Sequence, residues 1–191
     1  MAADEEFFDR LVQNRRSLKS FNGNAVSKAS VEKILNWATQ SPNHLLNQPW
    51  RFRVCLQGGI QSFVECLKTR VSESEWKALN SGAQRLLTAG ALIIVSVQRG
   101  ESELRREENF AAAAAATQSL LLGATALGIR SFWSTGKLMR HDETRSLFGI
   151  PDEEIFVGGI WLGEGPIPPS PPRRPLEEVS QWFDDFTTPS T

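Results

Sequence analysis

The sequence predicts one domain of the α+β class, in which helices cover a central sheet. Helical and strand patterns alternate along the 191 residues, and several helical segments precede the first strong strand. Two apolar runs, Ala91–Val97 and Ile155–Leu162, are typical of buried strands. The length fits one compact domain, and no linker separates two cores. We therefore expect a single domain over residues 1–191, with an extended, proline-rich C-terminal segment at 164–191.

Composition excludes several classes of partner. The formal net charge is −1, which argues against nucleic acid or an anionic membrane surface as the main partner. Cys55 and Cys66 lie in apolar segments without metal-ligand spacing, so we expect buried free thiols and no metal site. The N-terminus is acidic and lacks the apolar core of a signal peptide, which predicts a cytoplasmic protein with no membrane partner.

The first half of the chain contains helices and one alternating strand. Asp4–Asn14 places its apolar residues on one helical face, and Ser27 or Ser30 caps a second helix that runs to Ala38. Arg51–Leu56 alternates polar and apolar residues, as an amphipathic strand does. An amphipathic helix follows over 60–67, and Ser72 with Glu75 predicts the capping box of the next one.

The second half is organised around a long alanine-rich helix. The pattern predicts a helix over Glu107–Leu127, with six consecutive alanines, that is apolar nearly all round and buried on most faces. Gly128 is suited to the helix C-cap, and a strand at Ile129–Trp133 leads into a tight turn at 134–136. Short helices are expected over 142–148 and over 176–183. The long helix either forms part of a ligand site or is a plain core helix.

Three short polar clusters are candidates for chemistry. The first, Arg15 to Lys19, is either a solvated basic helix end or a phosphate site, since arginine and serine supply strong donors. The second is His44 with Asn47 and Gln48, in a loop that proline stiffens before Trp50. The third is the pair Arg173 and Arg174, isolated among prolines.

In this order, the motifs resemble the FMN-dependent nitroreductase family, in particular its small, minimal branch, over nearly the whole chain. The matching stretches are Arg15-Arg16-Ser17-Leu18-Lys19-Ser20-Phe21, Ser41-Pro42-Asn43-His44, Gln48-Pro49-Trp50-Arg51-Phe52, Glu108 to Ile129, Trp133-Ser134-Thr135-Gly136, Ile150-Pro151, 158–163 and Arg174-Pro175-Leu176. The resemblance implies a mostly antiparallel central sheet and a homodimer with FMN at the subunit interface.

The same resemblance implies the roles of the clusters. Arg15 and Ser17 would hold the FMN phosphate with Arg174 closing over it, and Lys19 would lie near N1 and O2 of the flavin. Residues of the Gln48 loop would reach the flavin from the partner subunit, and 133–136 would line the ring. The candidate cofactor-binding residues are Arg15, Arg16, Ser17, Lys19, Pro42, Asn43, His44, Gln48, Trp133, Ser134, Thr135, Gly136, Arg173 and Arg174.

Two positions depart from the family pattern. Many members have asparagine two residues before the glutamine of the Gln-Pro-Trp loop, where this chain has Leu46 and places Asn47 one position later. Lys19 stands where arginine is common, which keeps the charge but loses the bidentate fork.

The resemblance implies an enzyme in which NADH or NADPH reduces the flavin and leaves, and a nitroaromatic, quinone or similar acceptor then uses the same pocket. That is a ping-pong cycle, and it requires no catalytic side chain beyond the flavin and solvent. The alternatives are a specialised flavin enzyme, such as a dehalogenase or flavin-processing enzyme, and an FMN-binding module without turnover. The specialised enzymes usually carry an added lid, for which only the segment between Leu67 and Gly90 is a candidate.

Overall fold

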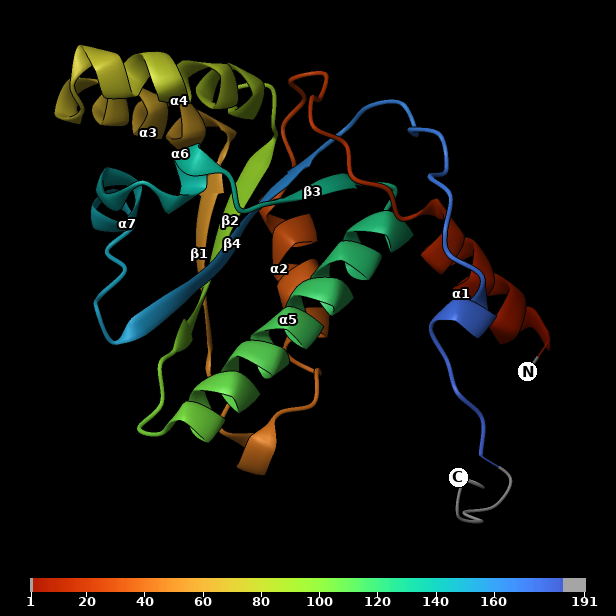
Figure 1. Cartoon of the computed structure of the whole chain (residues 1–191). Helices are drawn as coiled ribbons and strands as arrows, with labels where there is room; N and C mark the ends of the chain where they lie inside the picture. Colours follow the sequence, from red (N-terminus) through yellow and green to blue (C-terminus); the bar gives the residue numbers. More distant parts are fainter. Residues whose placement is uncertain (1, 184–191) are drawn as a thin grey trace.

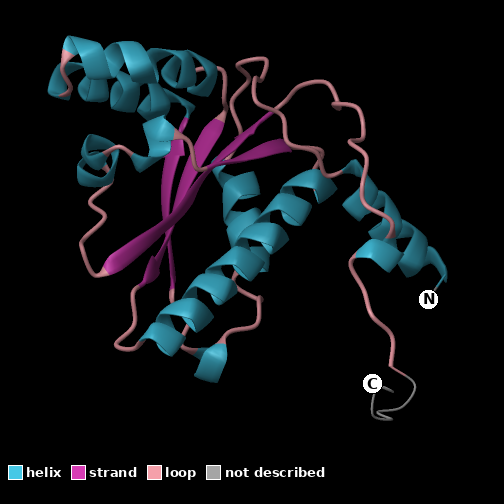
Figure 2. Ribbon diagram, viewed as in Figure 1, coloured by secondary structure: helices cyan, strands magenta, loops and turns pink. Residues whose placement is uncertain are grey.

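The sheet at the centre of the protein has four strands. In the computed structural model, which describes residues 2–183, they are β1 (Trp50–Leu56), β2 (Ala91–Gln98), β3 (Arg130–Ser134) and β4 (Glu154–Gly163). Their order across the sheet is β1-β2-β4-β3, and every neighbouring pair is antiparallel. The α+β prediction is therefore confirmed, and each predicted strand lies within one or two residues of its observed bounds (Figure 2).

Helices cover both faces of this sheet (Figure 1). Their bounds are α1 (Ala2–Asn14), α2 (Lys28–Ala38), α3 (Gln57–Arg70), α4 (Glu73–Leu86), α5 (Glu103–Ala126), α6 (Lys137–Arg140) and α7 (Asp142–Leu147), with 3-10 turns η1 (His44–Leu46) and η2 (Leu176–Glu178). Helices α2 and α5 bury one cluster of apolar residues against the sheet, and α3, α4 and α6 bury a second cluster on the opposite face. None of the helices in residues 2–183 combines the length and apolarity that a bilayer crossing requires.

Helix α5 begins four residues earlier than the sequence pattern predicts. The Ser102 hydroxyl accepts a hydrogen bond from the Arg105 backbone N–H at 3.1 Å and so caps the helix at Glu103. At the other end, Gly128 adopts a φ of 74°, and the N–H of Ile129 bonds to the Ala124 carbonyl at 2.9 Å. This is a Schellman cap, and it turns the chain directly into β3.

One face of α5 is buried in the chain and the other is not. Ala113 and Ala116 are fully buried against the sheet, whereas Ala111 and Gln118 are exposed and Ala114 is half-buried. The prediction that α5 is buried on most faces is therefore wrong for the single chain, because its outward stripe has no covering element within residues 2–183.

Local predictions elsewhere have mixed outcomes. Both halves of the Ser72–Glu75 capping box are formed at the start of α4, and Ser27 caps α2. The helix expected over 176–183 is only the 3-10 turn Leu176–Glu178, because the proline-rich chain before it packs little apolar surface. Both cysteines are free, but Cys66 is exposed and Cys55 half-buried, so the prediction of buried thiols is wrong. The part of the C-terminal segment at 184–191 lies outside the described residues.

Candidate functional site

A cavity of about 540 Å³ lies between α4, the end of β3 and α6. Its walls are formed by Lys19, by Ala78, Leu79, Ser81, Gly82 and Arg85 of α4, by 132–138, and by Trp161 of β4. The predicted flavin-ring residues Trp133, Ser134, Thr135 and Gly136 therefore line one cavity together with Lys19.

Two adjacent glycines in β4 admit large side chains to the two faces of the sheet beside β3. A Cβ atom at Gly158 would lie 2.0 Å from Nε1 of Trp133, and one at Gly159 would lie 2.4 Å from Sδ of Met139. The Trp133 indole crosses β4 in the space that Gly158 leaves open, and donates a hydrogen bond to the Val157 carbonyl at 3.2 Å. Trp133 packs with the α2 and α5 cluster and Met139 with the α4 and α6 cluster, so Gly158 admits the indole on the face away from the cavity and Gly159 admits α6 on the face that carries it.

The Arg15–Lys19 segment runs alongside β3. Ser17 forms a parallel bridge with Ser131, and the Leu18 N–H donates to the Ser131 carbonyl at 3.0 Å. This pairing fixes Ser17 against β3, with Arg15 two residues before it and Lys19 two residues after it. The Lys19 Nζ lies 5.8 Å from the centre of the Phe132 ring, at the cavity wall.

Three arginines gather at the start of this segment. Burial and the neighbouring charges of Arg16 and Arg173 lower the pKa of Arg15 from its ordinary value. Arg16 is held in place, because it donates to the Arg15 carbonyl at 2.8 Å and to the Ser170 hydroxyl at 2.7 Å. Within residues 2–183, no carboxylate forms an ion pair with Arg15, so the cluster has positive charge available for an anion. Arg174 is exposed on the same C-terminal segment.

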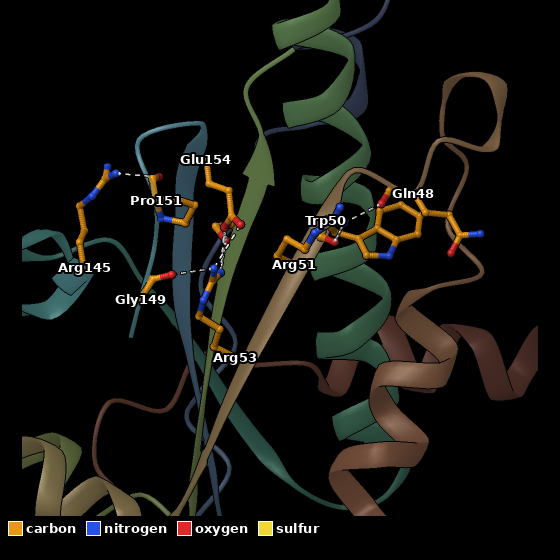
Figure 3. A network of polar contacts seen from close by, with 9 residues as sticks. Gln48, Trp50, Arg51, Arg53, Arg145, Gly149, Pro151 and Glu154 are labelled. Atoms are coloured by element: carbon orange, nitrogen blue, oxygen red, sulfur yellow. Dashed lines mark hydrogen bonds and ion pairs between the residues drawn. The ribbon is translucent and has the colours of Figure 1, made fainter. Parts of the chain in front are cut away.

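The Gln48 loop lies at the other end of the sheet. Trp50 pairs with Val97, and β4 pairs with β2 there through Ile155, whereas β3 pairs only with Gly159 to Gly163. The chain thus brings Lys19 and 133–136 together and keeps Pro42, Asn43, His44 and Gln48 apart from them. Figure 3 shows the Gln48 side chain pointing away from the polar network around Arg53 and Glu154.

Within this loop, the polar side chains are used mainly to shape the backbone. The Asn43 side chain accepts a hydrogen bond from the Gln48 N–H at 2.9 Å, and Gln48, Leu45 and Leu46 all have positive φ. Such values are unusual for residues other than glycine. His44 Nδ1 lies 3.3 Å from a carboxylate oxygen of Glu108, at the start of α5.

The side chain of the neighbouring Asn47 also makes a structural hydrogen bond within the chain. Its amide donates to the Asn109 side chain at 2.9 Å, and Asn109 in turn donates to the Gln98 carbonyl at 3.0 Å. Asn47 therefore anchors the loop to α5, a role that its place one position after the family's asparagine did not predict.

Sequence reasoning missed the contribution of α4. Arg85 on this helix lines the cavity far in sequence from the motifs, and Lys137, which directly follows the motif residue Gly136 at the start of α6, lines it too. The basic residue in the last turn of α4 resembles an ordinary helix-end charge, so no local pattern distinguishes it.

Comparisons with known proteins agree with this geometry. The family model described as "Nitroreductase family" matches residues 12–164. The Bacillus subtilis protein named "Putative NAD(P)H nitroreductase YfhC" is 30% identical over 158 residues, which cover 80% of this chain and 81% of that protein. A nitroreductase-like family protein from Bacillus cereus has a similar structure, with a TM-score of 0.84, 25% identity and coverage of 93% of this chain and 96% of that one.

Several of the similar solved structures are described as holding FMN, and one of them illustrates the match. It is described as a "putative nitroreductase in complex with fmn" from Desulfovibrio desulfuricans, and it has 26% identity and a TM-score of 0.71. The match covers 91% of this chain and 96% of that chain.

Proposed function

Because the chain belongs to the nitroreductase family, we propose that it is an FMN-dependent NAD(P)H oxidoreductase that reduces nitroaromatic, quinone or similar acceptors. The observation that carries the proposal is the arrangement of the Arg15–Lys19 segment. At one end it presents clustered arginines, of which Arg15 has no carboxylate partner within residues 2–183, and at the other it reaches an aromatic-lined cavity with Lys19. FMN has two parts that match this arrangement, a phosphate for the arginines and a flat aromatic ring for the cavity.

The residues fit this cofactor by their chemistry. Arg15 and Ser17 supply a guanidinium and a hydroxyl for a phosphate, with Arg16, Arg173 and Arg174 adding positive charge. Lys19 supplies a cation beside the cavity, and Trp133 to Gly136 supply its wall. When bound, FMN would supply the hydride chemistry, and these residues would position it.

The geometry also supports a homodimer. In one chain, Pro42, Asn43, His44 and Gln48 lie at the opposite end of the sheet from Lys19, so they would complete the site only from a partner subunit. The outward stripe of α5 is rich in alanine, and Phe110 beside it is 41% exposed. Small side chains permit a second helix to approach closely.

The donor and the acceptor would occupy the cavity in turn, since Lys19 and 133–136 meet there. Within residues 2–183, the residues that line it include no histidine, aspartate or glutamate. The side chains present would therefore bind and orient the reactants, while protons would come from solvent.

The phosphate assignment is tested by titrating the apoprotein with FMN and with riboflavin. We expect FMN to bind more tightly, and Arg15→Ala to weaken FMN about ten- to a hundredfold, as loss of a charge-assisted hydrogen bond implies. Riboflavin affinity should not change. Arg10→Ala, an exposed arginine on α1, is the matched control and should change neither affinity. Equal affinity of the wild type for both flavins would overturn the assignment.

Turnover is tested separately by steady-state oxidation of NADH or NADPH with a nitroaromatic acceptor. Oxidation that depends on both FMN and the acceptor supports an enzyme. A protein that binds FMN tightly and shows no such oxidation would instead be an FMN-binding module.

A further inference from the structure

The charge of the cavity wall is one-sided. Among the described residues that line it, Lys19, Arg85 and Lys137 are cations and none is an aspartate or glutamate. This asymmetry does not follow from composition, because the whole chain has a formal net charge of −1. A concave site lined by charges of one sign attracts ligands of the opposite sign.

Lys19 has an assigned task in the proposed function, but Arg85 and Lys137 do not. The Arg85 Nε donates to the Ser81 carbonyl at 3.2 Å, one turn back in α4, and within residues 2–183 its two terminal nitrogens have no partner. Lys137 likewise makes no ion pair or side-chain hydrogen bond within the described part of the chain. Both cations are therefore available to a molecule in the cavity.

The neighbouring packing keeps Arg85 at this wall. Helix α4 approaches α6 closely at Gly82, where an added Cβ would lie 3.4 Å from Cβ of Leu138. Ala83 and Leu86, on either side of Arg85 in the sequence, are fully buried, which fixes the rotation of the helix. Figure 1 shows α6 next to α4, and each of the two helices contributes one cation to the cavity lining.

We propose that Arg85 and Lys137 are specificity residues that select an anionic substrate, one that carries a carboxylate or phosphate group. The inference rests on the proposed function, because the reacting molecule shares the cavity with the flavin. The negative charge belongs either to the acceptor, as a carboxylate, or to the donor, as the additional phosphate of NADPH. Both sources present the same chemistry to a guanidinium, which binds either group through paired donors.

Binding is measured first, without turnover. Benzoate and benzamide have nearly the same shape and differ in charge, and either one perturbs the visible spectrum of a bound flavin. We expect the FMN-loaded wild type to bind benzoate more tightly than benzamide. Arg85→Gln should weaken benzoate about three- to tenfold, the size of one partly exposed charge contact, and leave benzamide unchanged. The preference should also shrink at high salt.

Two variants separate charge from structure. Arg85→Lys keeps the charge and should keep most of the preference for benzoate. Lys77→Gln removes an exposed cation from the same helix that does not line the cavity, and should change neither dissociation constant. Thermal melting of each variant verifies that α4 remains folded.

Kinetics then identify the source of the charge. If the acceptor carries it, Arg85→Gln lowers the ratio of kcat/KM for 4-nitrobenzoate over 4-nitrobenzamide about three- to tenfold. If the donor carries it, the same variant lowers the ratio for NADPH over NADH by that factor. The inference is overturned if wild type binds benzoate and benzamide equally, or if Arg85→Gln leaves both ratios unchanged.

The results that would overturn this inference can be distinguished from results that would overturn the proposed function. If the protein binds FMN and reduces neutral nitroaromatics without preferring anions, the proposed function holds and the anion selectivity of Arg85 and Lys137 is wrong. If FMN does not bind, the function fails, and the anion preference is measured on the unloaded protein through the fluorescence of Trp133 and Trp161, which line the cavity.

Discussion

Glu154, at the start of β4, is a buried carboxylate whose partners come from two other strands. It is 8% exposed and lies 2.8 Å from the Arg53 guanidinium of β1, and it accepts a hydrogen bond from the Ser96 hydroxyl of β2 (Figure 3). Burial acts to raise its pKa, but the hydrogen bonds from Arg53 and Ser96 outweigh burial and lower the pKa from its ordinary value. The folded state therefore stabilises the charged form of Glu154 more than the unfolded state does.

The pH dependence of stability has a definite sign. A carboxyl group with a lowered pKa stabilises the fold above its unfolded pKa, about 4.3 for glutamate, and this stabilisation is lost as pH falls through the folded pKa. At pH 7 we expect Glu154→Gln to reduce the free energy of unfolding by about 3 kcal/mol, because Arg53 is left without its ion-pair partner. Denaturant unfolding between pH 7 and pH 3 should show the difference from wild type shrinking below about pH 4.

The matched control for this prediction is Glu32→Gln. Glu32 pairs with Lys28 at 3.5 Å on the exposed surface of α2. Removing this ion pair should change the free energy of unfolding by no more than experimental error. A difference between wild type and Glu154→Gln that is constant over the whole pH range would contradict the assignment.

At the scale of elements, two glycines of β4 decide how closely β3 and α6 pack on the sheet. Trp133 occupies the space over Gly158, and Met139 of α6 occupies the space over Gly159. Phe132 packs edge-on against Trp161, with ring centres 5.4 Å apart. Two small residues in a strand that is otherwise bulky thus admit one aromatic side chain and one helix to the sheet.

Gly158→Ala should displace the Trp133 indole, because the added methyl would overlap its Nε1. Overpacking of this kind typically costs about 1–3 kcal/mol of stability. We also expect altered tryptophan fluorescence and weaker FMN binding. These are measured by denaturant unfolding, emission spectra and flavin titration.

Gly58→Ala provides the control, since a Cβ at this position in α3 meets nothing within 4 Å. It should leave the flavin affinity unchanged and stabilise the protein slightly, by up to about 1 kcal/mol, because alanine favours helix. Unchanged Trp133 emission in Gly158→Ala would show that the glycine is not required for the indole position.

At the scale of the whole molecule, the site proposed here is divided between two ends of the sheet. The cavity lies beside β3, while the Gln48 loop precedes β1 at the opposite end. Leu45 and Leu46 in that loop are 81% and 78% exposed, and the alanines on the outward stripe of α5 have no cover within residues 2–183. A homodimer would cover these surfaces and bring the two ends together.

We expect the wild type to sediment as a dimer and Ala114→Glu to sediment as a monomer. Ala114 lies on the outward stripe of α5 between Ala111 and Gln118, where an interface would bury a carboxylate without a partner. The variant should also bind FMN more weakly, because the residues from the partner subunit are lost.

Ala29→Glu is the control for added charge, since it places the same side chain on an exposed position of α2. It should remain dimeric. A wild type that sediments as a folded, flavin-loaded monomer would contradict both the dimer and the shared site.

The sequence by itself determined the features that depend on neighbours in the chain. The apolar runs of β2 and β4, the Ser72 capping box and the Gly128 cap follow from local periodicity and backbone preference, so their positions could be predicted. The order of the motifs also determined the family.

Only the tertiary structure decided which side chains meet at the cavity. Lys19, Arg85 and Phe132 are separated by tens of residues, and their meeting depends on the parallel bridge at Ser17 and the packing of Gly82 on Leu138. The register that ends β3 at Ser134 likewise keeps the cavity away from the Gln48 loop. Such contacts result from the packing of whole elements, on which a local sequence pattern carries no information.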